Sequence, residues 1–186
     1  MANSAFELTS SQSGFVLLDT QTASTSATLD FTSSIDGTYD HYEFHLINLR
    51  PATDGVRLYL RTSTDGGSTY DSGASNYTFI LTGYVNGSVS NNNSASLGTT
   101  FVALNSPTIG NAATESISGV VRMYQPSEAT YTQMNWGVGG HSTAVDANFW
   151  QNGQGRRQSS ADVDAVRFLM SAGNITSGIV KLYGVN

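Results

Sequence analysis

Apolar and polar side chains alternate along much of this chain. Residues 56–61 carry valine or leucine at every second position, with arginine or tyrosine between them. Successive side chains of a β-strand point to opposite faces, so such a segment has one apolar face and one solvated face. The same period of two recurs in residues 27–31 and 42–46. This pattern predicts half-buried strands.

Further short apolar runs are separated by residues that favour turns. They lie at residues 14–19, 77–81, 101–104, 117–124, 131–136, 148–150, 163–170 and 175–184. About ten short strands result, and no segment keeps the 3.6-residue apolar period of a helix. Strands and helices do not alternate, which argues against a doubly wound nucleotide-binding fold. The sequence therefore predicts an all-β protein, an antiparallel β-sandwich or jelly roll.

The remaining segments are polar and are expected to connect the strands. Residues 83–98 are rich in asparagine and serine and predict a long surface loop, and the glycines of residues 151–157 predict a turn. One short helical turn near residues 161–162 would be compatible with the sandwich. Residues 1–13 lack a core pattern and are expected to form an N-terminal arm, either frayed or docked on a neighbour. Residues 14–186 are expected to form a single domain.

One stretch, residues 58–73, is predicted to form a strand, a tight reversal and the start of a second strand. Glycines after Asp65 supply the positive backbone angles that a short hairpin turn requires. By residue type, this reversal resembles the Asp-box, a Ser-x-Asp-x-Gly-x-Thr-aromatic motif of sialidase propellers and other β-proteins, at Ser63, Asp65, Gly67, Thr69 and Tyr70. The resemblance implies that the aspartate caps turn amides and that the aromatic ring packs inward. These five residues are therefore expected to be structural.

The composition argues against several classes of binding partner and site. The net charge is −6 and Lys181 is the only lysine, so a groove for nucleic-acid phosphates has little basis. The absence of cysteine excludes disulfides and thiolate metal sites. No apolar run reaches the roughly 18 residues of a membrane span, and the first residues do not resemble a secretory signal. Neither a nucleic-acid nor a membrane partner is expected.

Candidate catalytic and metal sites are weak. His41 and His45 would share one face of a strand, but no further zinc ligands accompany them. Asp65 and Asp71 offer oxygen ligands for calcium, yet the repeating aspartate pattern of a calcium loop is missing, which favours turn capping. A single Asp-box without an arginine cluster argues against a sialidase, and no Gly-x-Ser-x-Gly elbow is present. We therefore predict no enzyme, no metal and no cofactor.

Six side chains are of the types that contact a partner or a glycan, namely Tyr59, Tyr84, Trp136, Trp150, Arg156 and Arg157. The last four are the candidate contact residues. Aromatic ring faces stack on apolar surfaces, and the planar guanidinium presents several donors at once. These residue types are also the ones that dominate binding energy at protein interfaces.

Two stretches, residues 60–77 and 164–184, resemble small structural proteins of tailed bacteriophages, and the glycines and arginines of residues 153–157 fit the same comparison. The resemblance implies a virion location. It makes a capsid decoration (cement) subunit the first expectation, a homotrimer that binds the major capsid protein or other virion proteins. The alternative is a tail-fibre or receptor-binding module for a host glycan. A glycan hydrolase is a third hypothesis, which the missing catalytic carboxylates disfavour.

Overall fold

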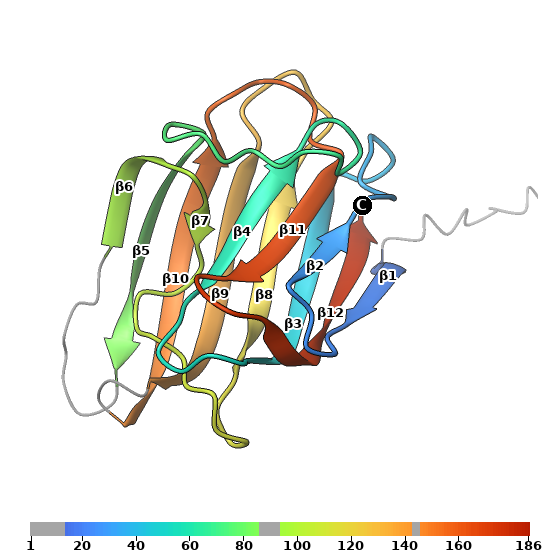
Figure 1. Cartoon of the computed structure of the whole chain (residues 1–186). Helices are drawn as coiled ribbons and strands as arrows, with labels where there is room; N and C mark the ends of the chain where they lie inside the picture. Colours follow the sequence, from blue (N-terminus) through green and yellow to red (C-terminus); the bar gives the residue numbers. More distant parts are fainter. Residues whose placement is uncertain (1–13, 86–93, 143–145) are drawn as a thin grey trace, which may run out of the picture.

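The computed structural model describes residues 14–85, 94–142 and 146–186, which form two antiparallel sheets packed face to face (Figure 1). The larger sheet has the strand order β1 (Val16–Thr22), β12 (Ile175–Val185), β3 (His41–Pro51), β8 (Ile117–Tyr124), β9 (Gln133–Ser142), β10 (Ala147–Arg157), β5 (Tyr77–Val85) and β6 (Ser94–Thr99). The smaller sheet has the order β2 (Thr28–Phe31), β11 (Ala165–Met170), β4 (Leu58–Ser63) and β7 (Val102–Ala103). No helix occurs among these residues. The predicted antiparallel β-sandwich is confirmed.

The core lies between the two sheets and is filled by the inward positions of each alternating strand. Phe31 of β2, Phe168 of β11 and Phe44 of β3 are fully buried. Their rings meet edge to face, with centroids 5.3 Å apart for Phe44 and each of the other two. Phe44 belongs to the large sheet and the other two rings to the small sheet, so this aromatic cluster joins the layers.

Residues 151–157 continue strand β10 instead of forming the expected turn. Gly153 is paired with Trp136 of β9, and the indole of Trp136 lies directly over it on the core side. A Cβ atom at position 153 would overlap this ring. The indole is 3% exposed, and its Nε1 donates a hydrogen bond of 2.9 Å to the carbonyl oxygen of Leu104. Glycine is required here by close packing and not by a turn.

The predicted hairpin at residues 58–73 is wrong, although its turn is present. Gly66 and Gly67 have the expected positive φ angles of 68° and 82°. After the turn the chain crosses to the other sheet, where it continues as β5, so β4 and β5 are not paired. The amide of Thr62 donates instead to the Tyr77 hydroxyl at 2.8 Å. The Tyr77 hydroxyl thus accepts the hydrogen bond that a paired strand would otherwise accept from the Thr62 amide.

Strands β1 and β2, which follow each other in the chain, lie in different sheets. The predicted loop at residues 83–98 also differs from the expectation. Strand β5 extends to Val85 and β6 begins at Ser94, so both ends of the predicted loop at residues 83–98 are strand. Its centre, residues 86–93, and the predicted arm, residues 1–13, lie outside the described residues.

Candidate functional site

The structure separates the four predicted contact residues into two buried and two solvent-facing ones. Trp136 is part of the core. Arg157 is 4% exposed; its Nε lies 2.5 Å from Asp71 Oδ2, and its Nη1 donates to two backbone carbonyls. Neither side chain is available to a partner in this fold, which corrects the expectation for both. Trp150 and Arg156 lie on the outer face of β10.

Trp150 forms a flat platform on the outer face of the large sheet. Its register partner on β9 is Gly139, and Gly137 lies two residues further along the same face. A Cβ atom at Gly137 would lie 3.1 Å from Trp150 Cζ2, and one at Gly139 would lie 2.9 Å from Trp150 Cε3. The indole therefore rests on both glycines while remaining 50% exposed. One face of the ring packs on the sheet and the other is open to solvent.

A second aromatic ring lies beside this platform. Tyr84 of β5 is the register partner of Trp150 on the opposite side of β10, and it is 64% exposed. Directly paired residues on one face of an antiparallel sheet have their Cβ atoms about 5 Å apart. Two exposed aromatic side chains thus occupy neighbouring positions on the same face.

An open hollow of about 500 Å³ adjoins the platform. Its lining comes from three adjacent strands, with Gly119, Val120 and Arg122 of β8, Asn135, Trp136 and Gly137 of β9, and Trp150, Asn152 and Gly153 of β10. Three of these nine residues are glycines, and the hollow lies where side chains are missing from the sheet surface. Asn135 donates a 2.9 Å hydrogen bond to Tyr124, whereas the exposed carboxamide of Asn152 has no hydrogen-bond partner among the described residues. The hollow combines an aromatic surface with two carboxamides, of which that of Asn152 is free to bind a ligand.

A buried carboxylate holds one end of this hollow in place. Glu43 is 3% exposed, yet it lies on the outward side of β3, between His41 and His45. Its oxygens lie 2.5 Å from Arg122 Nε and 2.9 Å from His45 Nε2. Burial opposes ionisation of Glu43, but the hydrogen bonds from His45 and Arg122 outweigh it and lower the pKa. Arg122 is thereby fixed beside the hollow.

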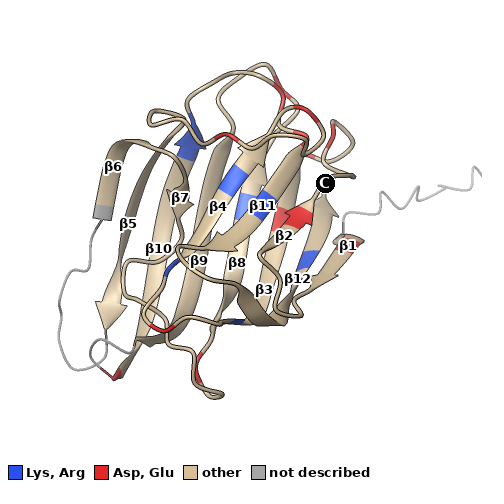
Figure 2. Ribbon diagram, viewed as in Figure 1, with Lys and Arg blue, Asp and Glu red and all other residues tan. Residues whose placement is uncertain are grey.

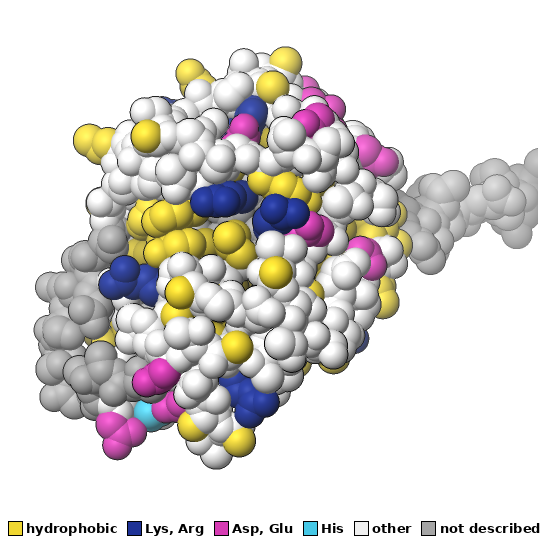
Figure 3. Space-filling view, viewed as in Figure 1, with side chains coloured by type: hydrophobic (Ala, Val, Ile, Leu, Met, Phe, Trp, Pro, Cys, Tyr) yellow, Lys and Arg dark blue, Asp and Glu magenta, His cyan; other side chains and the backbone are white. Residues whose placement is uncertain are grey.

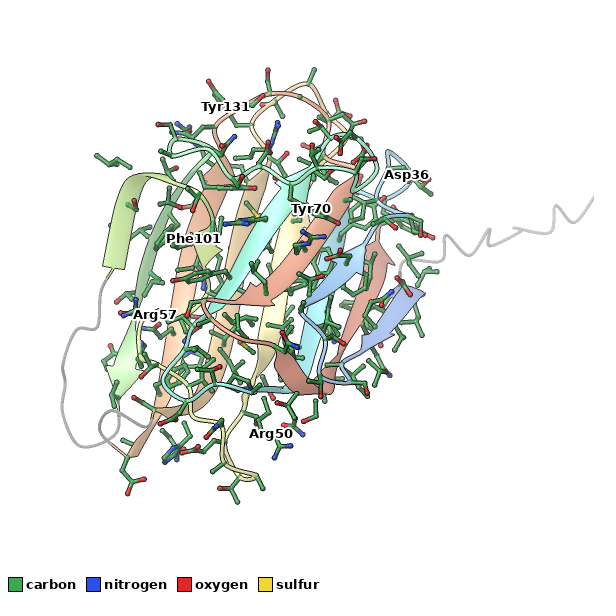
Figure 4. All side chains as sticks on the ribbon, viewed as in Figure 1. Asp36, Arg50, Arg57, Tyr70, Phe101 and Tyr131 are labelled. Carbon is green, nitrogen blue, oxygen red and sulfur yellow. The ribbon has the colours of Figure 1, made fainter. Side chains whose placement is uncertain are left out.

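The opposite side of the sandwich carries a second distinctive surface. Tyr59 and Arg61 lie on the outer face of β4, and Arg57 immediately precedes this strand. The Tyr59 ring stacks on Phe101 with centroids 3.7 Å apart. Figure 2 shows basic residues on β4 and β11, and Figure 3 shows hydrophobic side chains gathered among arginines on this face. Arg57 and Phe101 are labelled over the small sheet in Figure 4. We call Arg57, Tyr59, Arg61 and Phe101 the small-sheet patch.

The five residues of the Asp-box resemblance build the turn after β4. Asp65 Oδ1 accepts hydrogen bonds from the Thr69 amide at 2.8 Å and the Ser63 hydroxyl at 2.7 Å, and Oδ2 accepts one from the Thr69 hydroxyl at 2.6 Å. The Ser63 hydroxyl oxygen also accepts from the Gly67 amide at 3.0 Å. The aspartate caps the turn, as the resemblance implied.

Tyr70 departs from that resemblance, because its ring does not enter the core. The ring is half-buried and lies beneath the guanidinium of Arg167, whose Cζ is 3.8 Å from the ring centroid. Arg167 is held in turn by two hydrogen bonds to Asp30, of 2.8 and 2.6 Å. Figure 4 shows Tyr70 over the small sheet. The aromatic residue of the motif packs against an ion pair on the outer face.

The hydrogen bonds of Asp65 predict an acid-sensitive turn. Those from the Thr69 side chain and amide and from Ser63 lower the pKa of Asp65 to about 2. The unfolded-chain pKa is about 3.9, so the stabilisation is complete above pH 4 and is lost as the pH falls through 2. Asp65→Asn should therefore flatten the decline in unfolding free energy between pH 4 and 2, measured by urea denaturation. Asp162→Asn serves as the control, and an unchanged decline in Asp65→Asn would contradict the capping role.

His141 belongs to a different group of ion pairs from His41 and His45. His141 lies 3.4 Å from Glu115 and 3.4 Å from Asp146, far along the chain from His41 and His45. Within residues 14–85, 94–142 and 146–186, no group of three or more histidine, aspartate or glutamate side chains could hold a metal ion. The same residues contain no helix of the length and apolarity needed to span a membrane.

No protein-family model, curated protein or solved structure matches this chain.

The sequence pointed to Trp150 and its neighbour Tyr84, but not to the arginine, the asparagines and the glycines around them. Arg122, Asn135 and Asn152 lie on three strands and come together only through the β8-β9-β10 register. Gly137 and Gly139 did give a signal, since glycine at alternate positions of a strand marks a close approach by another group. That signal could be interpreted only once Trp150 was known to be paired with Gly139.

Proposed function

We propose that this chain is a glycan-binding module on a bacteriophage virion, of the tail-fibre or receptor-binding kind. The observation that carries the proposal is the exposed indole face of Trp150, which lies flat on two glycines beside a hollow lined by carboxamides. Sugar rings have an apolar face of C–H groups and a rim of hydroxyls. An aromatic ring stacks on the apolar face, and amide side chains form hydrogen bonds with the hydroxyls.

The structural role of Trp150 does not account for its exposure. A ring laid over strand glycines stabilises a sheet, and Trp136 over Gly153 does this on the buried side of the same two strands. Trp150 repeats the arrangement on the outer side, where the free ring face gains nothing from the core. An exposed aromatic surface next to a polar hollow is typical of a binding site.

The virion setting is supported by the bacteriophage resemblance of residues 60–77 and 164–184. The second stretch covers β11 and nearly all of β12, and the first covers the end of β4 with the Asp65 turn. Both belong to the scaffold and not to the hollow. The resemblance therefore supports a virion location for the protein, whereas the hollow supports a glycan as its ligand.

Binding of the purified native chain to an array of bacterial lipopolysaccharide and capsular oligosaccharides tests the proposal. We expect binding to a small subset of the array, and competition by the same oligosaccharides free in solution. An array without a single bound oligosaccharide, together with no attachment to bacterial cells, would reject glycan recognition.

A decoration subunit remains the second candidate, and the small-sheet patch is the observation that favours it. Arginine and tyrosine are enriched among residues that dominate protein interfaces, and this patch presents both around a stacked ring pair. In that case the chain would bind undecorated heads as a homotrimer, and Arg57→Ala would weaken this binding. Head binding without binding to any glycan would favour decoration over receptor recognition.

A further inference from the structure

We propose that the hollow beside Trp150 selects acidic glycans, with Arg122 binding a sugar carboxylate. This inference rests on the proposed glycan-binding function and names the class of sugar. It concerns one end of the hollow, where β8 contributes Arg122 and β9 contributes Asn135.

The first observation is the charge of the lining. Arg122 is the only ionisable side chain among the nine lining residues, and none of them is aspartate or glutamate. The whole chain has 14 acidic and 8 basic residues. The lining of the hollow, with one arginine and no acidic residue, is therefore more basic than the chain as a whole. A negatively charged ligand would contact guanidinium and amide N–H donors here, and no carboxylate lines the surface, although the buried Glu43 offsets the formal charge of Arg122.

The second observation is the unused hydrogen-bonding capacity of Arg122. Its Nε lies 2.5 Å from Glu43 Oε1, but its two terminal nitrogens have no partner among the described residues. The side chain is 42% exposed. Since a guanidinium is planar and presents five N–H donors in a fixed fork, one edge can be held by Glu43 while terminal donors remain for a second carboxylate.

Glu43 is a positioning residue in this arrangement. Its carboxylate is almost completely buried and does not line the hollow, so a ligand would meet the arginine and not the acid. Nε2 of His45 lies 2.9 Å from Glu43 Oε2, so the carboxylate is held by both His45 and Arg122. The arginine is therefore held in a fixed orientation before a ligand arrives, which reduces the entropy lost on binding.

The register also places both contacts within reach of one ligand. The Trp150 indole extends from Gly139 over Gly137, which is paired with Val120, two residues before Arg122 on β8. At about 3.3 Å per strand residue, this offset is about 7 Å along the strands. A sugar ring stacked on the indole and a carboxylate at Arg122 therefore fit within one short oligosaccharide.

The test uses uronic-acid oligosaccharides of bacterial capsules and the same oligosaccharides after carboxyl reduction, which converts each uronic acid into a neutral hexose. Affinities are measured by calorimetry at low salt. We expect the native chain to bind at least one acidic oligosaccharide about tenfold more tightly than its reduced form, the size of one charge-assisted hydrogen-bond pair. Arg122→Gln should remove this ratio but keep binding of the reduced form.

Two further variants keep the test decisive. Arg122→Gln leaves Glu43 buried without its arginine, so the double variant Arg122→Gln with Glu43→Gln removes both charges and should show the same loss of selectivity. Arg57→Gln, on the opposite side of the sandwich, should keep the native ratio. Equal affinities of the native chain for acidic and reduced forms would overturn the acidic preference while leaving glycan binding intact. Binding to neither form would also overturn the acidic preference, whereas the proposed function is rejected only if the oligosaccharide array and the bacterial cells are unbound as well.

Discussion

Replacing Trp150 with alanine should weaken glycan binding about 30-fold while leaving the sandwich folded. The indole supplies the only large aromatic surface that lines the hollow from the outer side of the sheet, and central aromatic residues of binding sites contribute about 2 kcal/mol or more. That loss corresponds to an affinity about 30-fold lower. Because the ring is half-exposed, the free energy of unfolding should fall by only about 1 kcal/mol, as for a cross-strand pair.

Two variants control this experiment. Trp150→Phe keeps a flat ring over Gly137 and Gly139 and should retain part of the affinity. Tyr131→Ala removes another exposed aromatic side chain, which contacts Arg156 and does not line the hollow, and should bind like the native chain. Native affinity in Trp150→Ala, measured on any glycan bound by the native chain, would exclude the platform from the binding site.

Replacing Trp136 with alanine should have the opposite effect, a large loss of stability. The buried indole fills the space over Gly153, and its loss leaves a cavity and removes the hydrogen bond to the Leu104 carbonyl. Truncation of a buried tryptophan costs about 3–5 kcal/mol. Urea denaturation of Trp136→Ala should therefore show a much lower midpoint than that of Trp150→Ala.

Gly153→Ala probes the same contact from the other strand. Its methyl group would overlap the Trp136 ring, which the core and the Leu104 hydrogen bond hold in place, and overpacking of this kind costs about 1–3 kcal/mol. The two tryptophans differ in role if stability depends on one and binding on the other. A smaller stability loss in Trp136→Ala than in Trp150→Ala would contradict this division.

The period of two predicted the strands well because one side of each strand faces the core. Residues 117–124 were predicted as a strand, and β8 has those bounds. Leu58 and Leu60 are fully buried and Arg57 is exposed, as the alternation required. Local patterning therefore determines which segments are strands and which of their faces are apolar.

Glycine misled the prediction at residues 151–157. A glycine can adopt the positive φ angles of a turn, or it can leave room for a ring from a neighbouring strand. The sequence alone does not distinguish these two reasons for a glycine. Gly66 and Gly67 are of the first kind, whereas Gly153 is of the second. The distinction depends on Trp136, which the chain places beside Gly153 only through sheet pairing.

The faces of the two tryptophans could be only partly predicted. Met134, Trp136 and Val138 follow a period of two, and this pattern gave a signal that Trp136 is buried; the predicted strand, however, ended at residue 136. Arg157 gave no such signal, because its burial depends on Asp71, which lies 86 residues earlier in the chain. Long-range partners of this kind are not encoded in local spacing.

The most direct test of the account follows the two indole N–H resonances of the chain by nuclear magnetic resonance while a glycan identified on the array is added. Trp136 and Trp150 are the only tryptophans, so each signal can be assigned with a single variant. We predict that the Trp150 resonance shifts in proportion to the bound fraction and that the buried, hydrogen-bonded Trp136 resonance changes little. A saturating glycan that leaves the Trp150 resonance unmoved would contradict the claim that its exposed face is the binding platform.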